Sequence, residues 1–250
     1  MVSAKRKRPS GRKIYLDEHT MSEFAERVKN RKLVMILPIG AVEGHGNHLP
    51  LCTDSIQPER IAERVALSGE LDAIIAPPIR YGNCQSTKKF PGTLSIDPDV
   101  LRALVRNILL ELARNGVRNI VVLSGHAGSV HMAALRQAAQ DAVDCFNLNI
   151  MVLSDYDIAY DFSGDTAPKD DGHAGMIETS RVLSIRPDLV KMNFARKGKV
   201  SIPRFRIVRD PDIYWKNAVD GNPQTASIEF GNSVNEYITK GLIGHIKKML

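Results

Sequence analysis

The sequence has few of the features that would assign it to several common classes of protein. It has three cysteines among 250 residues and no Cys-x-x-Cys pair, which argues against a disulfide framework and favours a reducing compartment. No apolar run approaches the ~20 residues that a membrane-spanning helix needs, and the N-terminus lacks the apolar core of a signal peptide. We therefore expect a soluble, cytoplasmic protein with no membrane partner.

Acidic residues are absent from residues 1–13, and this absence explains the net charge of the chain. The six lysines and arginines of this stretch equal the whole formal charge of +6, because acids and bases balance in the rest of the chain. A short basic segment can contact phosphates, but it is more often a solvated leader. We therefore predict a disordered basic tail at residues 1–13. Because the excess positive charge is confined to this tail, a nucleic-acid partner is not expected.

Strand and helix patterns alternate along the remaining chain. At 43% hydrophobic residues, the chain can bury a full core, most simply as one domain at residues 14–250. Strands are predicted at 33–36, 73–76, 119–123 and 149–153, and helices at 20–28, 61–69, 97–116, 133–143, from about 174, and at 233–250. Residues 191–224 lack periodicity and are interpreted as a lid or subunit contact. The alternation predicts an α/β fold with a mainly parallel sheet, in which ligands bind beyond the carboxyl ends of the strands.

The glycine- and proline-rich stretch 37–54, which follows the first strand, carries four candidate metal ligands. Glu43 and His45 lie two residues apart, so their side chains point the same way in extended backbone. A lone Glu-x-His is usually polar surface, but His48 and Asp54 follow within a dozen residues. Carboxylate and imidazole together are a ligand set for zinc or manganese.

Two further histidines lie in glycine-rich turns at predicted element boundaries. His126 follows the strand at 119–123, and His173 precedes a helix whose first turns contain Glu178. A glycine-flanked turn can also bind phosphate, and an acidic residue near a helix start often only complements the helix dipole. The turns match neither Gly-x-Gly-x-x-Gly nor the lysine-containing P-loop, so the pattern favours a metal site over a nucleotide site.

Four motifs, in this order, resemble the signatures of the creatininase (creatinine amidohydrolase) family. They are the stretch 37–54, Phe90-Pro91-Gly92-Thr93-Leu94-Ser95, Ser124-Gly125-His126-Ala127-Gly128, and His173-Ala174-Gly175-Met176-Ile177-Glu178-Thr179-Ser180. The resemblance implies a three-layer α/β/α fold and an enzyme that hydrolyses C–N bonds in small amides. It also implies two divalent metal ions, zinc and/or manganese with iron as a further candidate, and often a homohexamer.

The resemblance also implies roles for individual residues. Glu43, Asp54 and His126 would hold one ion, and Asp54 would bridge to a second ion held also by His45. In creatininase the second ion takes a glutamate two residues beyond the histidine of the third motif, where this chain has Gly128.

We hypothesise that Glu178 fills this gap or hydrogen-bonds the reacting water. His173 matches the residue that is thought to move protons in the family, and we hypothesise that it is the general acid. The candidate substrate contacts are His48, Ser124, Gly125 and Ala127. Alternatively, His48 supports one of the metal ligands.

Substrate identity follows less directly from the sequence. Creatininase is expected to hold its flat substrate with aromatic side chains, one of them directly after the histidine of the third motif, where this chain has Ala127. The only tryptophan, Trp215, is distant in sequence but can fold back over the site. Lys88 and Lys89 can contact an anionic substrate, although adjacent lysines are more often solvated.

Two classes of function stay open at this stage. The first is a metal-dependent amidohydrolase that acts on a small cyclic amide or formamide, or a related hydrolase that trims a peptide. The second is a non-hydrolytic metal-binding protein with an assembly or regulatory role. Because Ala127 stands where an aromatic side chain is expected to hold a flat substrate, creatinine itself is a poor candidate for the substrate.

Overall fold

The computed structural model describes residues 13–162 and 170–250 of the chain. The tail predicted at 1–13 therefore lies outside the described residues, except for Lys13, which forms an ion pair with Glu23. The strands are β1 (Val34–Ile39), β2 (Ala73–Ile75), β3 (Asn119–Ser124) and β4 (Asn149–Ser154). The α-helices are α1 (Met21–Arg27), α2 (Thr53–Leu67), α3 (Pro98–Arg114), α4 (Ser129–Cys145), α5 (Asp155–Phe162), α6 (Met176–Ile185) and α7 (Ile228–Met249). Short 3₁₀ helices lie at Leu16–Glu18, Pro187–Leu189, Met192–Phe194, Pro211–Tyr214, Lys216–Ala218 and Pro223–Thr225.

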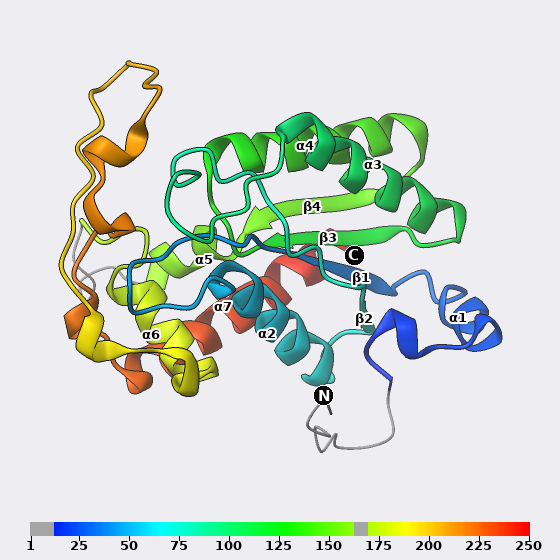
Figure 1. Cartoon of the computed structure of the whole chain (residues 1–250). Coiled ribbons are helices and arrows are strands. Elements are labelled where there is room, and N and C mark those ends of the chain that lie inside the picture. The colour runs from blue at the N-terminus through cyan, green and yellow to red at the C-terminus, as the bar shows by residue number, and fades with distance from the viewer. Residues whose placement is uncertain (1–12, 163–169) are drawn as a thin grey trace.

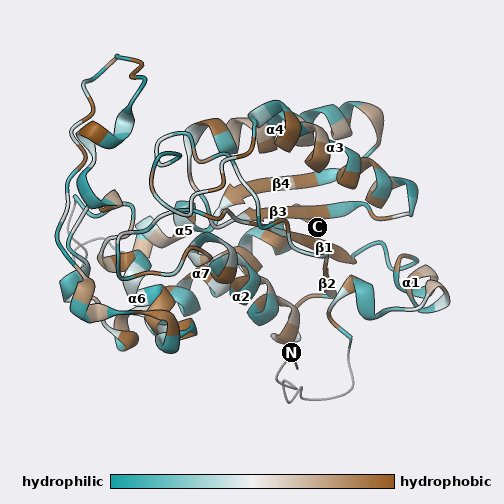
Figure 2. Cartoon of the chain, in the orientation of Figure 1, coloured by the Kyte–Doolittle hydropathy of each residue, from teal (hydrophilic) through white to brown (hydrophobic). Residues whose placement is uncertain are grey.

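The strands form a parallel sheet in the order β2-β1-β3-β4. Every residue of β1 and β3 is buried, as expected for central strands that are covered on both faces. In Figure 2 these strands are strongly hydrophobic, whereas the helices around them have one hydrophobic and one hydrophilic side. The predicted mainly parallel sheet is confirmed.

Alternate strand residues divide the core into two halves. Val34 and Val121 pack with side chains of α2, α5 and α7 on one face, and Met35 and Ile120 pack with α3 and α4 on the other. Figure 1 shows the sheet between these two helix layers. Each large aliphatic side chain buried in this way contributes about 1.5–3 kcal/mol. The three-layer α/β/α fold that the family resemblance implied is therefore confirmed.

Several helix boundaries differ from the prediction. Helix α2 begins at Thr53 rather than near residue 61, because Pro58 lies inside it and conceals its first turns in the sequence pattern. Asp54 is therefore in the first turn of a helix and not in a loop. Helix α5 was not predicted, and α7 begins at Ile228, where the side chain of Ser227 accepts a hydrogen bond from the Phe230 N–H.

Residues 196–215 form an arm that extends away from the helix layers (yellow to orange in Figure 1). A bridge between Val200 and Trp215 joins its two limbs, and a bridge between Gly198 and Gly221 connects its base to the following segment. Near the tip, Phe205 and Ile207 are 95% and 97% exposed. The predicted irregular lid or contact region at 191–224 contains this arm. Across the part of the chain that the structure describes, no helix is long and apolar enough to cross a membrane.

Candidate metal centre

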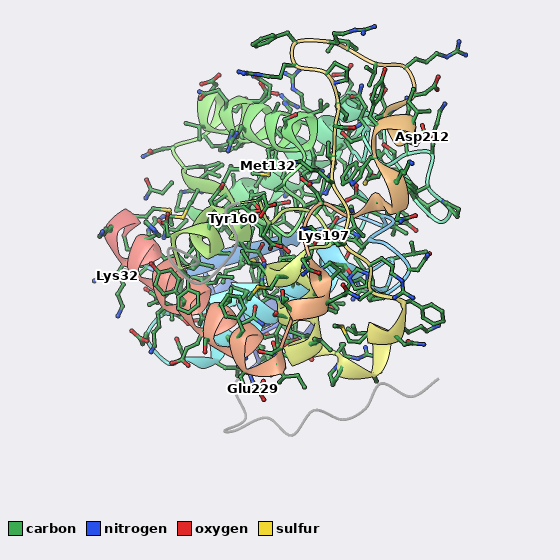
Figure 3. The ribbon with its side chains drawn as sticks, turned by 90° about the vertical axis from the view of Figure 1, so that its left-hand side faces the viewer. Lys32, Met132, Tyr160, Lys197, Asp212 and Glu229 are labelled. Atoms are coloured by element: carbon green, nitrogen blue, oxygen red, sulfur yellow. The ribbon has the colours of Figure 1, made fainter. Side chains whose placement is uncertain are left out.

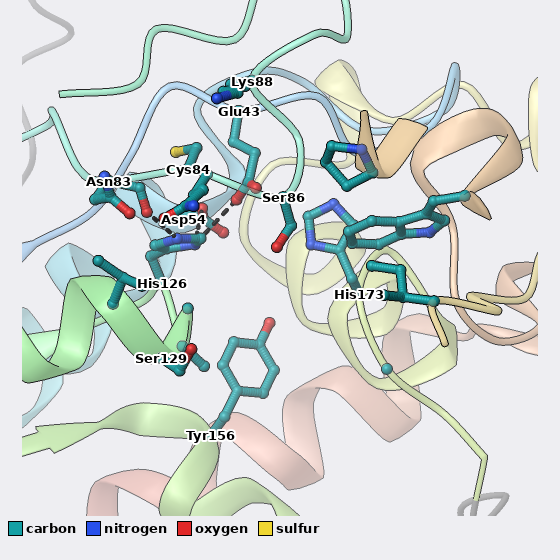
Figure 4. Close-up of a pocket in the computed structure, with 18 of the residues that line it drawn as sticks. Glu43, Asp54, Asn83, Cys84, Ser86, Lys88, His126, Ser129, Tyr156 and His173 are labelled. Carbon is teal, nitrogen blue, oxygen red and sulfur yellow. Dashed lines mark hydrogen bonds and ion pairs between the residues drawn. The ribbon is translucent and has the colours of Figure 1, made fainter. Parts of the chain in front are cut away.

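The predicted ligands come together at the carboxyl ends of the central strands. The segment after β1 supplies Glu43 and His45, the turn after β3 supplies His126, and the first turns of α2 and α6 supply Asp54 and Glu178. All five side chains are buried, with 1–7% of their surface exposed. Figure 4 shows Glu43, Asp54 and His126 converging at one end of a cavity. Five ionisable groups at such burial need charge compensation.

Asp54 lies at the centre of this cluster and faces both His45 and His126. Its Oδ1 is 3.0 Å from Nε2 of His45, and its Oδ2 is 3.1 Å from Nδ1 of His126. The close approach depends on Gly125, because a β-carbon there would lie 2.1 Å from the Asp54 carbonyl oxygen. The turn after β3 therefore packs directly on the start of α2, and this contact brings Asp54 beside His126.

The ring of His126 is oriented by the backbone. Its Nε2 lies 2.9 Å from the carbonyl oxygen of Asn83, so this nitrogen carries the proton and donates a hydrogen bond. Its Nδ1 then faces Glu43 Oε2, 2.9 Å away, and Asp54. A hydrogen bond from one ring nitrogen to a carbonyl, with the other nitrogen among carboxylates, is the usual arrangement of a metal-binding histidine.

His45 has the same arrangement. Its Nδ1 lies 3.0 Å from the carbonyl oxygen of Glu43 and donates to it. Its Nε2 faces Asp54 and also Glu178, whose Oε2 is 3.6 Å away. Ligand atoms of His45, Asp54 and Glu178 all lie within 4.8 Å of one another, which is compatible with a common cation.

Unpartnered buried atoms test whether these residues fit a metal ion. Glu43 Oε2, His45 Nε2 and Asp54 Oδ2 are buried, and none of them has a hydrogen-bond partner among the described residues. Their short contacts with each other therefore bring charged groups close together without hydrogen-bond alignment. Such orphaned atoms are costly unless something else satisfies them. Divalent cations accept oxygen and nitrogen ligands and would satisfy all three atoms. The residues of the cluster are therefore suited to bind metal ions.

Charge interactions in the cluster shift the pKa values of both imidazoles. Burial by itself lowers the pKa of His45, but the carboxylates of Asp54 and Glu178 raise it to about 10. Burial also acts to lower the pKa of His126, and Glu43 with Asp54 raises it well above its usual range. A cation that enters the cluster replaces these protons as the counter-charge, so its binding releases protons.

Glu178 is held by donors on two helices. Its Oε1 accepts hydrogen bonds from the Tyr156 hydroxyl at 2.5 Å and from Gln57 Nε2 at 3.3 Å, and its Oε2 accepts from the Ala174 N–H at 2.6 Å. Burial acts to raise the pKa of Glu178, but the charges of His45 and other neighbours lower it. Glu178 therefore presents an oriented carboxylate toward His45.

A buried ion pair fixes the spacing between α5 and α6. Arg181 on α6 is fully buried and contacts Asp155 at the start of α5 at 2.5 Å, and it also donates to Asn235 on α7. Breaking such a pair by removing one partner costs about 3–5 kcal/mol. The pair thereby holds Tyr156, which is next to Asp155 on α5, within reach of Glu178 on α6.

His173 lies beside the cluster, between His45 and Trp215. Its ring stacks on His45 with centroids 4.0 Å apart, and the edge of Trp215 is 4.9 Å away. Its Nε2 is 2.9 Å from the Gly44 carbonyl oxygen, so this nitrogen donates and Nδ1 keeps its lone pair. Burial lowers the pKa of His173, with a further contribution from His45. The imidazole is neutral at neutral pH and can accept a proton there.

A cavity of about 440 Å³ opens above the cluster. We call Glu43, Asp54, His126, His173 and Glu178 its floor, and Trp215 and other arm residues also line it. The tryptophan therefore does fold back over the site. The volume is within the usual range for small-molecule pockets.

The predicted substrate contacts divide into two pairs. Gly125 and Ala127 line the cavity. His48 and Ser124 do not: His48 Nε2 is 3.0 Å from the Thr179 hydroxyl, and the Ser124 hydroxyl donates to the His126 carbonyl oxygen at 2.7 Å. In the structure these two side chains contact neighbouring protein groups rather than the cavity.

Sequence reasoning missed several residues around the site. Tyr156 follows β4 directly, so the rule that ligands gather at strand ends was a signal that could have found it. Asn83 and Cys84 lie in a loop without a motif, and nothing in the sequence marked them. Cys84 offers its sulfur within 4.8 Å of ligand atoms of Glu43 and His126.

His131 was missed as well, and it supports the turn that carries His126. Its Nδ1 accepts a hydrogen bond from the Asn83 N–H at 3.2 Å, and its Nε2 donates to the Ser124 hydroxyl at 3.1 Å. Burial lowers the pKa of His131 to about 3, with a smaller contribution from His126. His131 is therefore neutral and rigidly paired.

A three-layer α/β/α fold whose strand ends carry buried carboxylates and imidazoles, with a cavity above them, defines the class of metal-binding α/β hydrolases. Comparison with known proteins agrees with this class and narrows it. The family described as "Creatininase: Creatinine amidohydrolase" matches residues 17–246. The chain belongs to the creatininase family.

Three relatives illustrate the similarity. The creatinine amidohydrolase of Pseudomonas putida is 29% identical over 255 residues, which cover 94% of this chain and 96% of the relative. The mycofactocin precursor peptide peptidase of Mycolicibacterium smegmatis (strain ATCC 700084 / mc(2)155) is 30% identical over 235 residues, which cover 86% and 85%. A solved structure described as "Creatininase Mn" superposes with a TM-score of 0.86 at 27% identity, over 95% of this chain and 98% of that one. The chain is thus a hydrolase, and the non-hydrolytic interpretation of the sequence is not favoured.

Proposed function

We propose that this protein is a metal-dependent amidohydrolase that cleaves a C–N bond of a small cyclic amide or formamide. The observation that carries the proposal is the set of orphaned atoms on Glu43, His45 and Asp54, gathered at the floor of a cavity. Glu43, Asp54 and His126 would hold one divalent ion, and His45, Asp54 and Glu178 a second. Such ions lower the pKa of a water molecule toward ~7 and polarise an amide carbonyl.

The residues of the chain would supply the remaining steps. As water adds to the carbonyl carbon, Nδ1 of neutral His173 takes one of its protons. Because burial lowers the pKa of His173, the imidazolium formed is a stronger acid than usual. It gives the proton to the leaving nitrogen as the C–N bond breaks, which yields an acid and an amine. Trp215, with 7% of its surface exposed, covers His173 and limits access of bulk water.

The metal identity, assembly and location belong to the same proposal. Mixed imidazole and carboxylate ligands suit zinc and manganese. The described cysteines, Cys52, Cys84 and Cys145, are all free, which suits a cytoplasmic location. We also propose a single domain at residues 14–250 and a homo-oligomer, a hexamer by similarity to the family.

A peptide-trimming hydrolase is the second candidate. It is favoured by the 30% identity to the peptide peptidase relative. A basic, partly apolar arm beside the cavity is also compatible with a longer substrate.

One experiment tests both candidates. Protein loaded with zinc or manganese is analysed for metal per chain and then screened against cyclic amides, formamides and short peptides. About two ions per chain and turnover of one substrate class support the proposal. Metal-loaded protein that leaves every substrate class unchanged would contradict it.

A further inference from the structure

Besides the candidate metal ligands, the cavity is lined by positively charged side chains. Lys88, from the loop after β2, and Arg206 and Arg209, from the arm, all line the cavity. We call these three residues the basic wall. Glu43, Asp54 and Glu178 are the acidic residues that line the cavity, and all belong to its floor. Figure 4 shows Lys88 at the edge of the pocket, and in Figure 3 nitrogen-tipped side chains project from the arm, on which Lys197 and Asp212 are labelled.

The three charges of the basic wall have no partner in the part of the chain that the structure describes. No ion pair or side-chain hydrogen bond involves Lys88, Arg206 or Arg209 there. Their neighbour Lys89, in contrast, forms an ion pair with Asp210. The acidic residues at the base of the arm thus neutralise a lysine outside the cavity and leave the basic wall free.

Solvation alone explains a charged surface, but it does not explain this placement. The arm carries six basic and no acidic residues between positions 196 and 209, and only Arg206 and Arg209 among them reach the cavity. Lys88 reaches the same cavity from a separate loop. Two segments distant in sequence therefore present the same charge to one open cavity.

The charge balance of the cavity indicates what the basic wall binds. Divalent cations at the floor would more than neutralise its three carboxylates, and the basic wall adds three positive charges. A neutral substrate would leave these charges uncompensated as it displaces water, whereas an anionic substrate would pair with them. We propose that the basic wall is a subsite for an anionic group, a carboxylate or a phosphate, on a substrate whose amide lies at the floor. This inference rests on the proposed hydrolase function.

The anion-binding part of the inference can be tested by binding alone. Trp215 is the only tryptophan and lines the cavity, so its fluorescence reports an occupant. Metal-loaded protein is titrated with succinate, with its neutral counterpart succinamide, and with inorganic phosphate. We expect succinate or phosphate to bind at least about tenfold more tightly than succinamide, and less tightly as salt rises. Comparing the two anions distinguishes a carboxylate from a phosphate site.

Matched charge variants assign this binding to the basic wall. The test variant combines Lys88→Gln, Arg206→Gln and Arg209→Gln. The control combines Lys197→Gln, Lys199→Gln and Arg204→Gln, which remove the same charge from the arm outside the cavity. We expect the test variant to bind the anion at least about tenfold more weakly, and the control to change affinity by less than about twofold. Both variants should elute in gel filtration as the unchanged protein does.

Two results would overturn the subsite. The first is equal weakening in both variants, which would indicate only the general field of the arm. The second is no detectable binding of either anion to the unchanged protein below about 10 mM.

A hydrolysis assay separates failure of the subsite from failure of the proposed function. N-Formylglycine and the neutral N-formylglycinamide differ only in the carboxylate. If both are hydrolysed with equal kcat/KM, the subsite is wrong and the hydrolase stands. If no amide is hydrolysed but anions bind through the basic wall, the proposed function is wrong and the subsite stands.

Discussion

Replacing Glu178 with glutamine tests the proposal that Glu178 is a ligand of a second metal ion. The family resemblance implies a glutamate where this chain has Gly128, and the structure brings Glu178 to 3.6 Å from His45. The amide keeps the size of the side chain and an oxygen that can accept from the Ala174 N–H, so the fold should persist. It removes the negative charge that would face the cation.

The expected magnitude follows from the contacts. Loss of a group that only supports a metal ligand weakens metal binding about 10- to 100-fold, and loss of a ligand should cost at least the upper figure, about 2.7 kcal/mol. Among the described residues, Glu43 and His126 form no hydrogen bond or ion pair with Glu178, so the first ion should stay. We therefore expect Glu178→Gln to retain about one ion per chain where the unchanged protein holds about two.

The assay is elemental analysis after dialysis, followed by competition titration against a chelating indicator. Glu229→Gln is the control, because Glu229 is an exposed carboxylate in the first turn of α7. Urea unfolding should show both variants folded. Two ions bound by Glu178→Gln with unchanged affinities would refute the assignment of Glu178 as a ligand.

Three further predictions concern the residues around the centre. His173→Ala should lower kcat about 10²- to 10⁴-fold while metal content is unchanged, and full turnover would place the proton transfer elsewhere. Gly128→Ala should weaken binding of the first ion about tenfold or more, because its β-carbon would lie 2.6 Å from His126 Nε2. Gly244→Ala is the control for the metal analysis, because no atom lies within 4 Å of its added carbon. The pKa of His131 falls from 6.5 to about 3 on folding, so its contribution to stability is complete above pH 6.5 and is lost as pH falls toward 3. Between pH 7 and 5 the unfolding free energy from urea titration should therefore drop about 2 kcal/mol less in His131→Gln than in the unchanged protein, and equal drops would contradict the buried neutral state.

The sequence predicted the layers of the fold because burial leaves a strong periodic signal. Central strands such as β1 and β3 are apolar throughout, and amphipathic helices such as α3 repeat at helical spacing. The capping pair Thr20 and Glu23 and the helix start at Asp97 are local features, and both are present in the structure. The start of α2 was misplaced because Pro58 conceals its first turns, and only the structure shows them packed against the turn at Gly125.

The sequence by itself identified candidate metal ligands, because glycine-rich turns after buried strands are local patterns. These patterns supplied Glu43, His45, Asp54 and His126 as candidates, and the family resemblance added Glu178. Only the tertiary structure decided how they meet: which nitrogen of each histidine faces a carboxylate, and that Asp54 lies between the two rings. These relations depend on backbone carbonyls and on packing between distant segments, which leave no mark in the sequence. For the same reason the basic wall, built from one loop and one arm, emerged only when the chain was folded.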